Sequence, residues 1–207
     1  MKLYLSSYML GDHPEQMTAM VGDNKRTAII MNAADQYDSA KRPDYRDREI
    51  EKLGKLGLEA EELDLRDYFN ERGALAARLS QYGLVWVMGG NVFVLRRAMR
   101  ASGFDEIIAG MVRADKIVYG GFSAGACVVT PTLRGLELCD DPAVIPEGYG
   151  GEVIWDGLGF VPYSIAPHYR SPGHPETERV EQVVAYFREH DMPYRALRDG
   201  EAIVVDT

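Results

Sequence analysis

Ser123 lies in a stretch of the chain whose residue types suit a nucleophile. In the run Lys116–Val129, KIVYGGFSAGACVV, a β-branched segment precedes two glycines, the serine and then small residues that can begin a helix. This order predicts a strand, a tight turn and a helix, with Ser123 at the apex of a nucleophile elbow. Small neighbours permit the strained backbone of such a turn. The N–H of Ala124 would then point at an oxyanion that forms beside the hydroxyl.

Small residues after a strand also build phosphate-binding or purely structural turns, so a second interpretation stays open. The stretch contains no G-x-G-x-x-G or G-x-x-x-x-G-K-S/T pattern, and no basic residue follows the turn. A nucleophilic serine is therefore the favoured interpretation.

A serine hydroxyl needs a general base, and histidine is the usual base near neutral pH. His168 follows an apolar run and Pro167, where a strand would deliver it to the sheet edge that holds the elbow. It is therefore preferred over His174. His13 and His190 are expected at solvated or helix-capping positions. His168 and His174 lie six residues apart in a Pro/Gly-rich loop, without the helical H-E-x-x-H spacing, so no metal site is expected.

An acid must orient the histidine and stabilise its protonated form. Asp140 and Asp141 would give the chain order Ser, Asp, His, whereas Asp199 would give Ser, His, Asp. All three are also typical turn residues, and Asp199-Gly200 is a hairpin signal. The sequence favours Asp199 narrowly and leaves the other two open.

A second glycine turn, Gly89-Gly90-Asn91, directly follows the apolar run Leu84–Met88. Glycine lets the backbone approach a ligand closely, so the N–H of Gly90 could complete an oxyanion hole with that of Ala124. Asn91 is equally a candidate N-cap of the next helix, and the two interpretations are compatible.

The surrounding sequence alternates short apolar segments with helical patterns, which predicts a doubly wound α/β domain with a mostly parallel sheet. In such sheets, sites form beyond the carboxyl ends of the strands, where both glycine turns would meet. The expected strands are Lys2–Ser6, Thr27–Asn32, Leu58–Leu63, Leu84–Met88 and Lys116–Tyr119. The expected helices are Pro14–Val21, Tyr45–Leu56, Tyr68–Leu79, Val92–Ala101 and Phe104–Arg113.

The chain changes character after the elbow. Thr130–Pro162 is rich in Gly, Pro and acidic residues, which predicts a long excursion with short strands. Val161–Pro167 is a further candidate strand, and Glu176–His190 is a candidate helix. Tyr194–Leu197 and Ala202–Val205 are expected to close the domain as a hairpin.

Composition limits the classes of function. The 207 residues suit one domain, residues 1–207. A net charge of -9 argues against a nucleic-acid partner, and the apolar runs are too short to cross a membrane. Two cysteines and no signal-peptide pattern favour the cytoplasm.

Four motifs together resemble peptidase family S51, the aspartyl dipeptidases known as peptidase E and their cyanophycinase relatives. The motifs are Gly89–Phe93, Gly121–Ala126, Pro131–Arg134 and Pro167–Tyr169. The resemblance implies a flavodoxin-like or class I glutamine-amidotransferase-like fold. It also implies a serine peptidase without metal or cofactor, a small peptide substrate with N-terminal aspartate, and a homodimer.

By position, Ser123 matches the nucleophile of the family and His168 its base. The family acid corresponds either to Asp140 or Asp141, or to Asp199, where the family carries a glutamate. The chain also departs from the usual G-G-G-N-T stretch.

Recognition of an N-terminal aspartate would need a cation, and the fork of an arginine suits a carboxylate. Arg170 and Arg134 are the candidates, with Asn91 as a further substrate-binding residue. The sequence and the resemblance together predict a serine exopeptidase that hydrolyses dipeptides through an acyl-enzyme. An α/β-hydrolase-like esterase is one alternative. A non-catalytic, amidotransferase-like protein that binds a small ligand is another.

Overall fold

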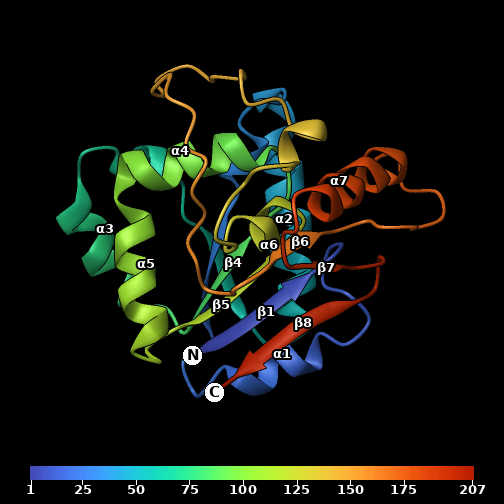
Figure 1. Ribbon diagram of the computed structural model, residues 1–207. Coiled ribbons are helices and arrows are strands. Elements are labelled where there is room, and N and C mark those ends of the chain that lie inside the picture. The colour runs from blue at the N-terminus through green and yellow to red at the C-terminus, as the bar shows by residue number, and fades with distance from the viewer.

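A six-stranded sheet forms the centre of the computed structural model, which describes residues 1–207 (Figure 1). The strand order is β3-β2-β4-β5-β1-β8, and every neighbouring pair is parallel except β1 and β8. The expected α/β architecture with a mostly parallel sheet is thus confirmed. The strands are β1 (Lys2–Ser6), β2 (Arg26–Ile30), β3 (Glu59–Glu62), β4 (Leu84–Val87), β5 (Val118–Phe122) and β8 (Ala202–Asp206).

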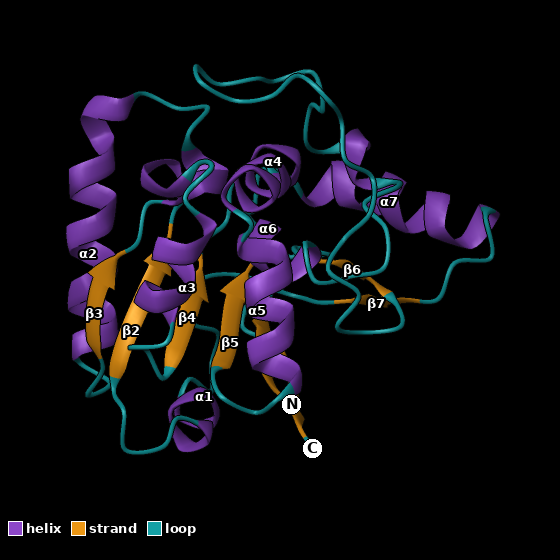
Figure 2. Cartoon of the chain, turned by 90° about the vertical axis from the view of Figure 1, so that its left-hand side faces the viewer, coloured by secondary structure: helices purple, strands orange, loops and turns teal.

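Helices cover both faces of this sheet (Figures 1 and 2). The helices are α1 (Glu15–Met20), α2 (Arg42–Gly54), α3 (Arg72–Leu79), α4 (Val92–Ser102), α5 (Phe104–Arg113), α6 (Ala124–Cys127) and α7 (Thr177–Glu189). In β4, Leu84 and Trp86 belong to a core cluster with α1 and α2, whereas Val85 and Val87 belong to the larger core with α3 to α7. This alternation follows from the period of two in a strand. None of these helices has the length and apolar character that a membrane span requires.

The predicted closing hairpin is wrong. Strand β7 (Tyr194–Ala196) pairs in parallel with β6 (Ser164–Ala166) in a separate two-stranded sheet (Figure 2). Strand β8 instead joins the edge of the main sheet beside β1 (Figure 1). The Asp199-Gly200 turn therefore connects two sheets. A local turn signal cannot specify which distant strand its flanks pair with.

The excursion Thr130–Pro162 contains no strand, which corrects the expectation of short strands. Its one strand-like pairing is a bridge between Thr132 and Asp156. Buried arginines of α4 bind its backbone instead: the guanidinium of Arg97 donates to three carbonyls, and Nε of Arg96 donates to the Asp156 carbonyl at 2.8 Å. The three carbonyls belong to Pro142, Val144 and Glu152.

Candidate active site

Ser123 has the backbone of a nucleophile elbow. It connects β5 to α6 with φ 50° and ψ -117°, a conformation that side-chain-bearing residues rarely adopt. The turn closes because its glycines lack a Cβ. A Cβ on Gly125 would lie 2.1 Å from the carbonyl oxygen of Val87, and one on Gly121 would lie 2.8 Å from the carbonyl oxygen of Gly125. The predicted strand, turn and helix are thus confirmed.

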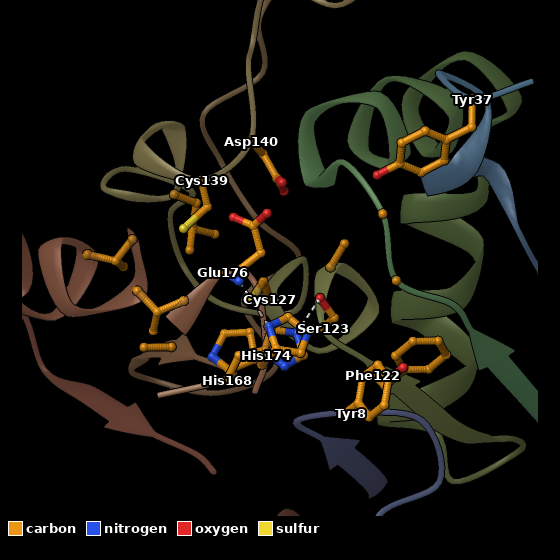
Figure 3. A pocket seen from close by; sticks show the side chains of 18 residues that line it. Tyr8, Tyr37, Phe122, Ser123, Cys127, Cys139, Asp140, His168, His174 and Glu176 are labelled. Carbon is orange, nitrogen blue, oxygen red and sulfur yellow. Dashed lines mark hydrogen bonds between the residues drawn. The ribbon is translucent and has the colours of Figure 1, made fainter. Parts of the chain in front are cut away.

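Ser123 begins a chain of three hydrogen-bonded side chains. Its Oγ lies 3.1 Å from Nε2 of His168 (Figure 3). Nδ1 of the same ring lies 2.7 Å from Oδ1 of Asp199. The three residues follow β5, β6 and β7, so the ends of two sheets meet here. This geometry orients the imidazole to take a proton from the hydroxyl.

Ser7 supports the histidine and the acid together, and the sequence analysis did not single it out. Its Oγ accepts the backbone N–H of His168 at 2.8 Å and lies 3.0 Å from Oδ1 of Asp199. Oγ of Ser171 accepts the backbone N–H of Asp199 at 2.8 Å. The available signal was the position of Ser7 directly after β1, at the sheet edge where the elbow also lies.

The other two candidate acids lie away from the histidine, at the start of α4. Oδ2 of Asp140 accepts the backbone N–H of Val92 at 2.8 Å. The backbone carbonyl of Asp141 accepts from Nδ2 of Asn91 at 2.9 Å, and its exposed carboxylate accepts the N–H of Ala143. The structure therefore brings Asp199, and neither of these, into contact with His168.

The glycine turn after β4 packs directly against the elbow. A Cβ on Gly89 would lie 3.0 Å from Cβ of Ser123, and a Cβ on Gly90, whose φ is 142°, would lie 2.4 Å from the carbonyl oxygen of Ala33. The N–H groups of Gly90 and Ala124 donate to no protein acceptor. Both are thus available to an oxyanion at Ser123.

Asn91 is the N-cap of α4, which confirms the capping role predicted for it from the sequence. Its Oδ1 accepts the N–H groups of Phe93 and Val94 at 2.9 and 3.1 Å. This cap fixes the start of the helix that follows the glycine turn. The side chain is buried and does not line the cavity beside Ser123.

A cavity of about 230 Å³ opens beside Ser123. The two arginines expected to bind a substrate carboxylate are not among its lining residues. Arg134 lies over the ring of Trp155, 4.2 Å from its centroid, and Arg170 pairs with Glu181 at 3.0 Å. The charged residues in the lining are instead acidic, and these are Asp140 and Glu176.

The ring of His168 is stacked on that of a second histidine, His174. The rings of His168 and His174 are 3.7 Å apart and within 3° of parallel, and Tyr8 contacts both at their edges. Ligand atoms of these histidines and Asp199 lie within 4.8 Å of one another. Parallel rings direct their in-plane lone pairs along separate planes, and both Nδ1 atoms already have hydrogen-bond partners. The cluster is therefore arranged for hydrogen bonding rather than for shared metal ligation.

Comparison with known proteins assigns this architecture to a family. The sequence model of peptidase family S51 matches residues 6–207. The chain belongs to peptidase family S51. The resemblance inferred from four short motifs is thus confirmed over nearly the whole sequence.

Two curated relatives of this S51 chain carry informative names. Peptidase E of Streptomyces coelicolor is 34% identical over 141 residues, which cover 66% of this chain and 54% of the relative. A Drosophila melanogaster protein named "Probable alpha-aspartyl dipeptidase" is 32% identical over 128 residues, which cover 58% of this chain and 49% of the relative. The chain thus spans about half the length of these two relatives.

Two solved structures share the fold of the S51 chain. A proposed peptidase E from Listeria monocytogenes superposes with a TM-score of 0.74 and 23% identity, covering 100% of this chain and 98% of that one. A peptidase from an acI-B1 Actinobacterium gives a TM-score of 0.67 at 15% identity, covering 99% and 82%. At these identities the likeness establishes the fold alone.

Proposed function

We propose that the protein is a serine exopeptidase that hydrolyses dipeptides. The observation that carries the proposal is the Ser123–His168–Asp199 chain at the edge of a cavity, with two unused N–H donors beside the nucleophile. Membership of a peptidase family supplies the bond type. Pockets for drug-sized ligands have volumes of roughly 300 to 1,000 Å³, and this cavity, at about 230 Å³, is smaller. It therefore suits a substrate shorter than a protein loop.

In this mechanism Ser123 attacks the scissile carbonyl while Nε2 of His168 accepts the hydroxyl proton. The N–H groups of Ala124 and Gly90 stabilise the tetrahedral oxyanion, and Asp199 stabilises the imidazolium. The imidazolium then protonates the leaving amine, and an ester forms between Ser123 and the acyl group. Water activated by the neutral histidine hydrolyses this ester and restores the hydroxyl.

The names of the relatives support dipeptides with an N-terminal aspartate as substrates to test. The lining of the cavity contains no arginine or lysine that would bind the aspartate side chain. We therefore propose dipeptidase activity in general and treat aspartate preference as a separate question.

Two measurements test the proposal. A fluorophosphonate probe is expected to label Ser123, as read by intact mass and peptide mapping, because the elbow presents a hydroxyl that its neighbouring imidazole can activate. Asp-Leu, Ala-Leu and Gly-Leu are then assayed for release of the free N-terminal residue. An unlabelled, folded protein that cleaves no dipeptide would overturn the proposal in favour of a ligand-binding protein. Faster turnover of p-nitrophenyl acetate than of every dipeptide would favour an esterase.

The rate of labelling should depend on pH through His168. Burial lowers the pKa of this imidazole below 6.5, against the opposing effect of its hydrogen bond to Asp199, and His174 lowers it further. The base acts only when neutral, so the rate should stay high at pH 6.5 and fall as the pH drops through the lowered pKa. Burial raises the pKa of Asp140 in the same cavity to about 7. Asp140→Asn removes this second titrating group. Because the expected midpoint belongs to His168, the pH profile of labelling should have the same midpoint in Asp140→Asn as in the wild-type protein. A midpoint above 6.5 in both proteins would contradict the expectation.

A further inference from the structure

The cavity beside Ser123 has an acidic wall formed by Asp140 and Glu176. Figure 3 shows their carboxylates pointing toward one another, on the same side of the Ser123–His168 pair. No other carboxylate lines the cavity, and no lysine or arginine does. The site already holds a nucleophile, so a ligand must enter this space, and the ligand must face two carboxylates.

Asp140 has no cation of its own. One carboxylate oxygen accepts the backbone N–H of Val92, and no ion pair involves the residue. Burial and the nearby Glu176 both raise its pKa, which indicates that a negative charge there is under-compensated. The guanidinium of Arg179 offsets this effect in part, but it pairs with Glu176 at 3.5 Å, and both of these side chains are more than a third exposed. A half-buried carboxylate without a cation of its own gains from a bound cation.

The position of Asp140 relates it to the reacting carbonyl. It is hydrogen-bonded to Val92, two residues after Gly90, whose N–H is one of the two oxyanion donors. Two residues of chain span at most about 7 Å. In a dipeptide the α-ammonium group is separated from the scissile carbon by a single carbon atom, so it enters the cavity together with that carbonyl.

We propose that Asp140 and Glu176 bind the α-ammonium group of the substrate's N-terminal residue. The inference rests on the proposed peptidase function and adds the feature that restricts it to free N-termini. Acetylation of the substrate removes the positive charge and leaves the carboxylates facing a neutral amide. The two carboxylates therefore select for a charged α-amino group, whichever side chain the N-terminal residue carries.

The test compares Asp-Leu and Ala-Leu with their N-acetyl forms. The wild-type protein should cleave the free dipeptides at least about tenfold better in kcat/KM, which corresponds to one charge-assisted hydrogen bond. Asp140→Asn and Glu176→Gln, which keep shape and remove charge, should each raise KM for the free dipeptides by about tenfold to 100-fold. The discrimination against the acetylated forms should shrink by the same factor. Glu178→Gln is the matched control, because this exposed glutamate lies in the first turn of α7, the helix whose N-cap is Glu176, and does not line the cavity.

Equal cleavage of free and acetylated dipeptides would overturn the inference, as would unchanged KM and discrimination in both variants. Fluorophosphonate labelling separates this failure from failure of the proposed function. A protein that is labelled at Ser123 and cleaves both substrate forms equally remains a serine peptidase without the ammonium subsite. A protein that is neither labelled nor active overturns both. Labelling of each variant at a rate similar to wild type verifies that the variants are folded around an intact nucleophile.

Discussion

Replacement of Ser123 by alanine is expected to abolish dipeptide hydrolysis and fluorophosphonate labelling. Neither cysteine of the cavity offers a substitute nucleophile, since burial raises the pKa of the Cys127 thiol well above its usual range and that of the Cys139 thiol to about 12, which keeps both protonated. Loss of a serine nucleophile in other triad enzymes lowers kcat by on the order of a millionfold, because the remaining members act only through it. The measurement is kcat for the best dipeptide of the panel, with thermal unfolding as a check on the fold.

Ser80→Ala is the control for this substitution, because Ser80 is exposed at the end of α3, far in sequence from the elbow, and its hydroxyl donates only to the Ala77 carbonyl. It should keep full activity. Residual turnover above about 1% in purified Ser123→Ala would point to a different nucleophile, since removal of either the nucleophile or its base costs far more than that.

Asp199→Asn should lower kcat by between about 100-fold and about 10,000-fold. Oδ1 of Asp199 lies 2.7 Å from Nδ1 of His168 and stabilises the tautomer that carries its proton there. An asparagine amide can donate to Nδ1 instead, which would leave Nε2 protonated and unable to accept the proton of Ser123. The charge that stabilises the imidazolium is lost as well.

Asp140→Asn and Asp141→Asn test whether either of these residues, rather than Asp199, is the acid that orients His168. Asp141→Asn should resemble the wild-type protein, because its carboxylate is exposed and caps a loop. Asp140→Asn should act on KM and leave kcat nearly unchanged. A large loss of kcat in either variant, together with a mild effect of Asp199→Asn, would transfer the role of the acid to the excursion.

The parallel sheet was predictable because most of its strands are largely apolar over their own short length, although β3 carries three glutamates. β1 occupies the predicted residues Lys2–Ser6, whereas β5 was expected to end at Tyr119 and continues to Phe122. The two glycines in this extension are paired with Tyr4 and Leu5 of β1. A glycine pair usually indicates a turn, and only the neighbouring strand makes it part of a ladder.

The site was partly predictable for a related reason. Ser123 and His168 each follow an apolar run, and that position at a sheet edge can be inferred from the sequence. The two-stranded sheet of β6 and β7 could not be inferred, and it is this sheet that makes Asp199 the neighbour of His168. The acidic wall was missed because Asp140 and Glu176 lie 36 positions apart and meet only across the cavity. The arginines expected at the site are engaged elsewhere, which their sequence positions do not indicate.

The Asp199-Gly200 turn, which leads from the small sheet to β8, also affects when activity can arise during synthesis. Ser123 is translated before Asp199, and β8, the edge strand that follows Asp199, pairs with β1. A chain on the ribosome that has not reached this turn therefore carries a serine with no oriented base. In the proposed mechanism, hydrolysis would therefore begin only after Asp199 has been made and placed beside His168, so a chain that ends before this turn would not cleave peptides.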